Sequence, residues 1–192
     1  MTLLIAGLFL FIAPHSIRIL ADDFRTRQIA KIGALPWKGI YALVSLLGFV
    51  LIVYGYGMAR GEPIVLWTPP LWTRPAATLL MLPAFALLAA AYVPGTHIKA
   101  AFGHPMLLAV KVWAFAHLIT NGTLADALLF GVFLVWSIAA YAASRRRDRK
   151  SGTGYPAGTI PRDLIALVVG FAAWIAFALW LHAWLVGVRP FT

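Results

Sequence analysis

Hydrophobic and polar positions are sharply segregated along this chain, with long uncharged stretches separated by short segments that hold most of the charges. Apolar stretches of about 18–25 residues are typical of membrane-spanning helices. The chain lacks the series of roughly ten-residue segments, alternating between hydrophobic and polar residues, that is typical of a transmembrane β-barrel. The pattern predicts an all-α, polytopic transmembrane bundle, because helices satisfy their own backbone groups in lipid. The six expected spans are Thr2–Leu20, Gly39–Ala59, Ala76–Val93, Pro105–Thr120, Leu124–Ala143 and Leu164–Val186.

The amino-acid composition agrees with a single membrane domain over residues 1–192. Hydrophobic residues make up 62% of the chain and charged residues only 11%. The absence of cysteine excludes disulfides, thiolate metal sites and cysteine nucleophiles. Residues 144–163 are basic and then rich in Gly, Ser and Pro, which predicts a flexible cytoplasmic loop within this domain.

Lysine and arginine are distributed unevenly between the two sides of the expected bundle. Of the 16 Lys and Arg residues, 12 lie in the first, third and fifth connections, three lie on the opposite side, and Lys111 lies within a span. Because basic connections face the cytoplasm, both termini are expected on the non-cytoplasmic side. Topology and anionic headgroups account for the net charge of +10, so no nucleic-acid partner is expected. The twelve residues are Arg18, Arg25, Arg27, Lys31, Lys38, Lys99, Arg145, Arg146, Arg147, Arg149, Lys150 and Arg162.

The fourth expected span contains the most informative polar residues of the chain. Ionisable groups inside a membrane are costly, and they indicate a functional site by default. A helix advances about 100° per residue, so His104 and Lys111 share one face. Trp113, His117 and Asn121 recur at intervals of four and form a second stripe.

The end of this span carries signals for a tight turn. Asn121-Gly122 predicts a helix stop, and Thr123 with Asp126 three positions later predicts a capping box at the next helix start. The fourth and fifth spans are therefore expected to form a tight antiparallel hairpin.

A neutral imidazole in an apolar bundle is a good ligand for haem iron, provided that its second nitrogen has a hydrogen-bond partner. His117 is one candidate, and His15 in the first span is another. Arg18, one turn after His15, can pair with a haem propionate or with a lipid headgroup. The alternatives are a structural, hydrogen-bonded His117 and a His15 that marks a polar helix end.

Two geometric questions stay open for a haem site. The expected spans place His15 and His117 about 12 Å apart in depth, so His104 remains a rival ligand. Small residues such as Gly7 either leave space for a porphyrin or let helices pack closely.

Several of these residues occur together in a known family. The early His15-Ser16, the opening His104-Pro105 and the run Trp113-Ala114-Phe115-Ala116-His117 followed by Asn121-Gly122 resemble the NnrU family of bacterial membrane proteins. The pattern also resembles the related plant and cyanobacterial 15-cis-zeta-carotene isomerase. That resemblance implies a multi-pass protein of the bacterial inner membrane and a haem b with His15 and His117 as iron ligands. The isomerase has a cysteine, proposed as an alternative ligand, where this chain has Ala114.

Three functional hypotheses follow. The leading one is an NnrU-type protein that binds haem b between the first and fourth spans and supports nitric oxide or nitrite reduction by redox sensing or electron transfer. Its partners would be the lipid bilayer and a reductase system or other redox partner. The second is an enzyme, a haem-dependent cis-trans isomerase of a carotenoid or other hydrophobic polyene. The third is a scaffold or small-solute carrier without haem, with His104 and Lys111 lining a polar path.

Overall fold

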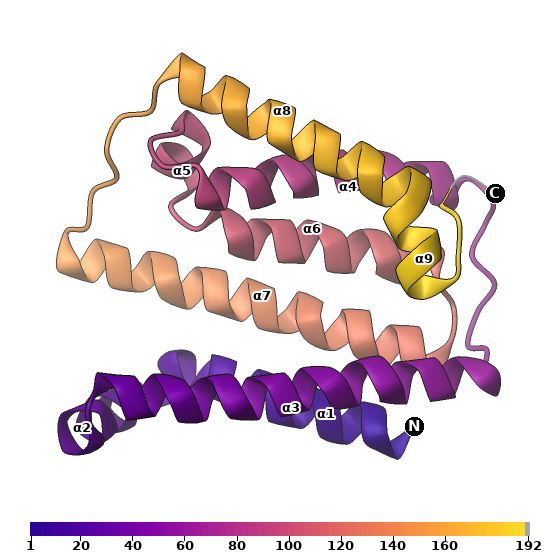
Figure 1. Cartoon of the computed structure of the whole chain (residues 1–192), viewed down its shortest axis with the longest axis horizontal. Coiled ribbons are helices and arrows are strands. Elements are labelled where there is room, and N and C mark those ends of the chain that lie inside the picture. The colour runs from indigo at the N-terminus through magenta and orange to yellow at the C-terminus, as the bar shows by residue number, and fades with distance from the viewer. Residues whose placement is uncertain (191–192) are drawn as a thin grey trace. The chain divides into compact units, whose positions relative to one another are not determined.

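The computed structural model describes residues 1–190, and within them the regular secondary structure is entirely helical. An isolated antiparallel bridge joins Val65 and Thr123. This confirms the all-α prediction. In chain order the elements are α1 (Thr2–Leu20), α2 (Asp22–Ile32), α3 (Ala34–Gly61), α4 (Thr73–Tyr92), α5 (His97–Phe102), α6 (Pro105–Thr120), α7 (Leu124–Ser151), α8 (Ile160–Ala176), the π-helical turn η1 (Phe177–Leu181) and α9 (His182–Val186) (Figure 1).

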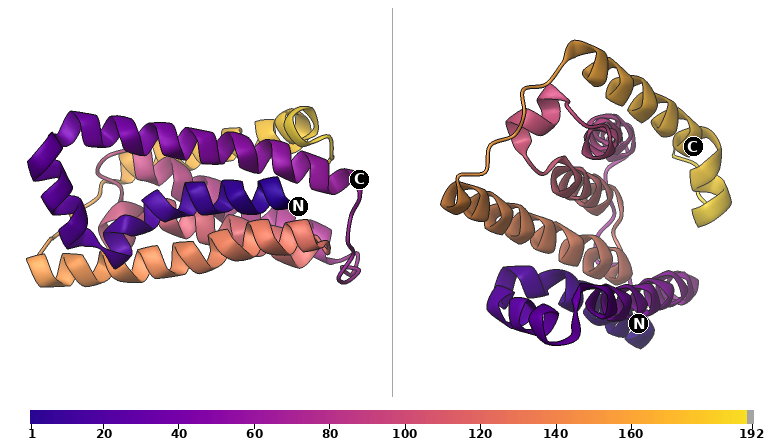
Figure 2. Two further views of the ribbon diagram at one scale, coloured as in Figure 1. Left: turned by 90° about the horizontal axis from the view of Figure 1, so that it is seen from below. Right: turned by 60° about the vertical axis from the view of Figure 1, so that its left-hand side comes forward.

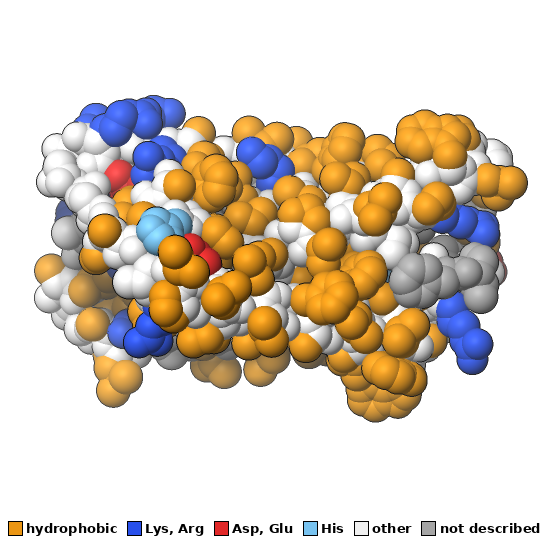
Figure 3. All heavy atoms as spheres, turned by 90° about the horizontal axis from the view of Figure 1, so that it is seen from above, with side chains coloured by type: hydrophobic (Ala, Val, Ile, Leu, Met, Phe, Trp, Pro, Cys, Tyr) orange, Lys and Arg blue, Asp and Glu red, His pale blue; other side chains and the backbone are white. Residues whose placement is uncertain are grey.

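Five helical stretches are long and apolar enough to cross a membrane, which is the architecture of a multi-pass membrane protein. Hydrophobic side chains cover the middle of the face drawn in Figure 3, whereas Lys and Arg gather mainly toward its ends. The sixth expected span, α6, has 16 residues and is about 24 Å long at 1.5 Å per residue. The number of spans and the side on which the termini lie stay predictions. The five stretches are Thr2–Leu20, Ala34–Gly61, Thr73–Tyr92, Leu124–Ser151 and Ile160–Val186.

The chain divides into two compact units. Unit 1 comprises Met1–Trp67 and Thr123–Val132, and unit 2 comprises Thr68–Gly122 and the chain from Phe133 onward. Helix α7 contributes its first residues to unit 1 and the remainder to unit 2.

In unit 1, α1 and α3 lie antiparallel and in close contact (Figure 2). A β-carbon added to Gly7 would lie 2.6 Å from the Ile52 backbone nitrogen, and one added to Gly48 would lie 2.6 Å from that of Phe11. The small residues of this face therefore allow close helix packing, as small residues commonly do in membranes. For Gly7 this favours the packing role that the sequence left open.

Helix α2 contacts both α1 and α3, and the hydropathy pattern does not predict it. It is polar and has 11 residues, too few to cross a membrane. Asp22 and Asp23 in its first turn and Lys31 in its last turn complement the helix dipole. The first connection is thus a short polar helix.

The capping box predicted at the start of α7 is confirmed within unit 1. The Thr123 hydroxyl and backbone N–H donate to Asp126 Oδ2 over 2.6 and 3.1 Å, and the Asp126 N–H donates back to Thr123 Oγ1 over 3.2 Å. The Tyr56 hydroxyl of α3 donates to Asp126 Oδ1 over 2.5 Å, so this buried carboxylate also links α3 to α7.

In unit 2, α4 packs against both α6 and α8, and Gly170 of α8 allows close approach to Ala86 of α4. Helix α6 begins with Pro105 in its first turn and ends at Thr120, where Asn121 leaves the helical conformation. The rings of Trp113 and Phe133 are 5.6 Å apart, and Lys111 Nζ lies 5.4 Å from the Tyr141 ring. The earlier residue of α6 contacts the later residue of α7, so the two helices are antiparallel, as the predicted hairpin requires.

The segment 144–163 is more ordered in secondary structure than the expected loop. Helix α7 continues through Ser151 because Arg and Lys are good helix formers, and α8 begins at Ile160. The Thr159 N–H donates to the Gly95 carbonyl over 3.0 Å. Only residues 152–159 therefore connect the two helices.

Candidate functional site

His117 lies in the last turn of α6, and its ring has a defined tautomer. Its Nδ1 lies 2.9 Å from the carbonyl oxygen of Trp113, one turn earlier. A carbonyl oxygen only accepts hydrogen bonds, so Nδ1 carries the hydrogen and the lone pair of the neutral ring is on Nε2. Histidines that bind metals through Nε2 show this second interaction.

The neighbours of His117 on α6 are those that the helical spacing predicted. The Trp113 ring centroid lies 5.5 Å from that of His117. The Asn121 side-chain amide donates to the His117 carbonyl oxygen over 2.8 Å. The stripe of Trp113, His117 and Asn121 is therefore a chain of contacts between successive turns.

A second histidine of unit 2, His182, lies beside His117 and was not predicted as a site residue. The His182 and His117 ring centroids are 6.4 Å apart, with 24° between the ring planes. His182 Nδ1 donates to the Val188 carbonyl over 2.7 Å, so its lone pair is also on Nε2. In the sequence His182 lies between Trp180 and Trp184, a pattern typical of a residue at the membrane interface.

His182 directly follows the π-helical turn η1, and this explains why sequence periodicity missed it. A π-helical turn shifts the faces of all later residues relative to a regular α-helix. Such turns occur often at functional sites. The only signal in the sequence was a histidine in an apolar stretch.

His15 lies in unit 1, half-buried in α1. Its Nδ1 donates to the Phe11 carbonyl oxygen over 2.6 Å, which gives it the same tautomer as His117. The Phe11 ring stacks on the imidazole at 4.2 Å between centroids, and the Tyr41 ring of α3 lies 5.1 Å away. Two aromatic rings therefore limit the rotation of this imidazole.

Arg18, expected to meet an anionic group, also lies in unit 1. Its side chain is exposed, and its Nε lies 4.0 Å from Asp22 Oδ1 at the start of α2. This ion pair is exposed to solvent, so it contributes little to stability.

His104, the rival ligand, has a different environment in unit 2. Its Nε2 lies 3.0 Å from Asp148 Oδ2 of α7 and 3.1 Å from the Tyr155 hydroxyl. The Tyr155 hydroxyl donates to Asp148 over 2.9 Å, and Arg145 Nη1 lies 3.4 Å from the same oxygen. Because a carboxylate only accepts, His104 Nε2 carries the hydrogen. The tautomer of His104 is thus opposite to that of His15 and His117.

This cluster lies at the junction of α6, α7 and the 152–159 segment. Burial, together with the hydrogen bond to Asp148, raises the pKa of the Tyr155 phenol above its ordinary value. Gly103 precedes His104 with a φ of +72°, and a β-carbon there would lie 2.7 Å from Arg145 Nη1. The positive φ favours glycine at this position, and a larger residue would also displace the Arg145 side chain.

Residues 1–190 contain no cluster of three or more His, Cys, Asp or Glu side chains that would hold a bare metal ion. A haem iron needs only one or two axial imidazoles, because the porphyrin supplies the other ligands. His15, His117 and His182 fit this requirement through Nε2, whereas His104 would have to bind through Nδ1 because its Nε2 hydrogen is directed to Asp148.

Comparisons with known proteins identify one relationship. The family model described as NnrU protein matches residues 3–190, nearly the whole chain. No curated protein and no solved structure matches the chain.

Proposed function

The chain belongs to the NnrU family, and from this premise we propose that it binds one b-type haem in the membrane through His117 and His15. The protein then supports nitric oxide or nitrite reduction by redox sensing or electron transfer. The observation that carries the haem proposal is the shared tautomer of these two histidines, with Nδ1 donating to a carbonyl oxygen of the same helix.

The surroundings of each imidazole support a role in ligation. The bond from Nδ1 to the helix carbonyl makes the opposite nitrogen more basic and fixes the ring orientation. At His117 the Trp113 ring limits rotation, and at His15 the stacked Phe11 ring does the same. These contacts lower the conformational entropy that each side chain loses when it binds a ligand.

The remaining residues contribute binding and charge. A b-type haem held by two imidazoles would supply one-electron exchange. Asn121 satisfies the His117 carbonyl oxygen and so stabilises the end of α6 that presents the ligand. Arg18 provides a cation on the same helix as His15 for a propionate.

The test is a comparison of absorption spectra of the full chain purified after expression with added haem precursor. The wild type is expected to show a Soret band in oxidised and reduced states. His117→Ala and His15→Ala are expected to reduce haem occupancy by about tenfold or more. Mutation of the hydrogen-bond partners of metal ligands already lowers metal affinity by about tenfold or more. His97→Ala is the matched control, because His97 pairs with Asp163 on α8.

Two further variants assign the second ligand. His104→Ala is expected to retain the spectrum, since the hydrogen on its Nε2 is used by Asp148. If His182→Ala loses the band and His15→Ala retains it, His182 is the partner of His117 and the assignment of His15 is wrong. Added imidazole should restore the band of His117→Ala, which separates loss of a ligand from misfolding. A wild-type protein without a Soret band would refute haem binding.

The pathway is tested separately in cells that respire nitrite. Replacing the chromosomal copy by His117→Ala is expected to cause nitric oxide to accumulate, whereas His97→Ala is not. Wild-type rates of nitric oxide consumption in the His117→Ala strain would refute the role in denitrification without affecting the haem proposal.

A further inference from the structure

Helix α2 and the first turn of α3 enclose a hollow of about 340 Å³ in unit 1. Its volume lies within the roughly 300–1,000 Å³ of small-molecule sites. Both helices belong to the first basic connection of the chain or adjoin it. The hollow is lined by Arg25, Thr26 and Ile29 of α2 and by Ala34, Trp37 and Lys38 of α3.

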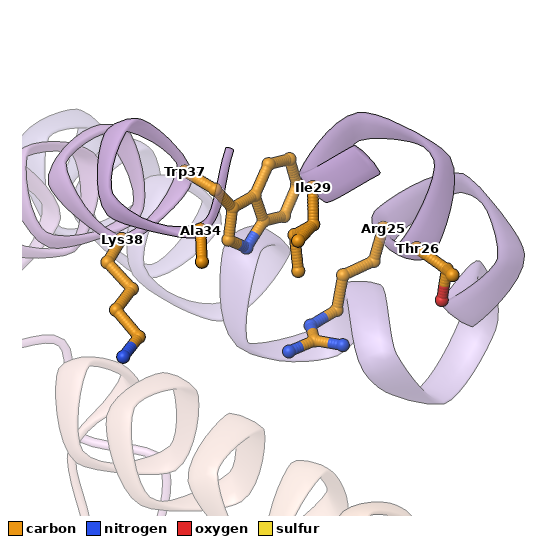
Figure 4. Close-up of a pocket in the computed structure, with 6 residues that line it drawn as sticks. All are labelled: Arg25, Thr26, Ile29, Ala34, Trp37 and Lys38. Carbon is orange, nitrogen blue, oxygen red and sulfur yellow. The ribbon is translucent and has the colours of Figure 1, made fainter. Parts of the chain in front are cut away.

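The two cations of this hollow point in a common direction. Figure 4 shows the Arg25 guanidinium and the Lys38 ammonium extending to the same side, with Trp37 and Ile29 between the two helices. Asp22 Oδ1 lies 3.9 Å from Arg25 Nη1. A guanidinium has five N–H donors, so this long contact does not satisfy it. The pair of cations is arranged for an anion larger than one carboxylate.

The Thr26 hydroxyl does not contribute to anion binding, because it donates to the Asp22 carbonyl oxygen over 3.0 Å. Figure 4 also shows its side chain directed away from the two cations. The charge of the site therefore comes from Arg25 and Lys38.

The apolar part of the lining favours a ligand that also has an apolar portion, because Ile29, Ala34 and Trp37 line the hollow with the two cations. Leu20 at the end of α1 and Leu35 in the first turn of α3 are 83% and 81% exposed, as is usual for side chains that face lipid. The Trp37 indole, held by an edge contact with Phe24 at 6.4 Å, is a residue type that favours the headgroup region of a bilayer. A phospholipid fits both features, because it joins an anionic phosphate to alkyl chains in one molecule.

We propose that the hollow between α2 and α3 binds the phosphate headgroup of an anionic phospholipid, with Arg25 and Lys38 as its cationic contacts and Trp37 as its interfacial wall. Basic pockets beside transmembrane helices bind acidic lipid headgroups in this way. The site lies in the connection expected to face the cytoplasm, where the membrane surface is negative. It requires no haem, so this proposal and the proposed function fail independently.

The experiment titrates the full chain in detergent micelles with phosphatidylglycerol and measures the first bound lipid by native mass spectrometry. The wild type is expected to bind phosphatidylglycerol more tightly than phosphatidylcholine. Arg25→Gln with Lys38→Gln should weaken this binding about tenfold or more. Arg27→Gln with Lys31→Gln is the matched control, since it removes the same charge from the same region outside the hollow.

Each other outcome overturns the proposal. Equal losses in the two double variants would show general attraction to a basic helix. Unchanged binding in Arg25→Gln with Lys38→Gln would place the lipid elsewhere. Equal affinity for phosphatidylcholine would remove the requirement for negative charge. Competition by millimolar inorganic phosphate without any preference for the lipid would identify a free-phosphate site. Circular dichroism of each variant checks that the helices are intact.

Discussion

Two histidines of this protein share one local geometry, in which an aromatic residue one helical turn earlier contacts the imidazole. Phe11 and His15 are four residues apart, as are Trp113 and His117, and in both pairs Nδ1 donates to the aromatic residue's carbonyl. Phe177 and His182 are five apart, and their rings meet at 6.0 Å because the intervening turn is π-helical. The spacing of four therefore sets which ring nitrogen of His15 and His117 carries the hydrogen, whereas His182 Nδ1 donates to the Val188 carbonyl oxygen instead.

Tyr155 gives a prediction on pH dependence at this scale. Its raised pKa means that the folded protein holds the phenolic hydrogen more tightly than the unfolded chain does. The stability from Tyr155 is therefore complete below the ordinary tyrosine pKa of about 10 and is lost as pH rises through the folded value. Tyr155→Phe should lower the free energy of unfolding by about 0.5–1.5 kcal/mol at neutral pH.

The measurement is thermal or denaturant unfolding of both proteins between neutral and strongly alkaline pH. The difference between wild type and Tyr155→Phe should shrink as the pH rises past 10, since the phenol ionises beside Asp148. A constant difference over this range would show that the hydroxyl does not couple to folding.

At the scale of elements, the α1 and α3 pair depends on glycines that permit backbone contact. In lipid the hydrophobic effect does not drive helices together, so close packing and its dispersion energy take its place. Gly48 of α3 faces α1, whereas a β-carbon added to Gly57 of the same helix would meet nothing within 4 Å. One helix thus contains both a test position and its control.

Gly48→Ala is expected to lower the free energy of unfolding by about 1–3 kcal/mol, because the methyl group must displace the backbone of α1. Gly57→Ala should be neutral or stabilising by up to about 1 kcal/mol through its higher helix propensity. Unfolding in micelles, followed by circular dichroism, measures both. Equal effects of the two substitutions would contradict direct packing at Gly48.

At the scale of the whole molecule, two compact units share helix α7 and carry an uneven charge distribution. The basic connections predict that the turn after α7 faces the cytoplasm and that the turn after α3 faces outward. The lack of native cysteine makes this arrangement directly measurable.

Single cysteines at Glu62 and Gly154 provide the test. A membrane-impermeant maleimide should label Glu62→Cys in intact spheroplasts and should label Gly154→Cys only after lysis. Gly154 has open space around it, so a side chain fits there. The opposite labelling pattern would invert the predicted topology.

Much of the fold follows from local sequence. The remaining parts depend on residues that are distant in the sequence. The first span was predicted at Thr2–Leu20, where α1 lies, and the Thr123 and Asp126 capping box was read from adjacent residues. The stripe through His117 followed from helical spacing. Asp148 and Tyr155, by contrast, are 44 and 51 residues from His104 in sequence, so their contacts required the fold.

The length of α6 has a consequence for the membrane itself. A helix of about 24 Å is shorter than a hydrocarbon core of about 30 Å, which produces negative hydrophobic mismatch wherever α6 crosses the bilayer. Thinning of the bilayer is one way to accommodate such a helix, and it brings water and headgroups closer to the Asn121 end. A local thinning of this kind would shorten the path from the aqueous phase to His117 and would favour membranes with short acyl chains.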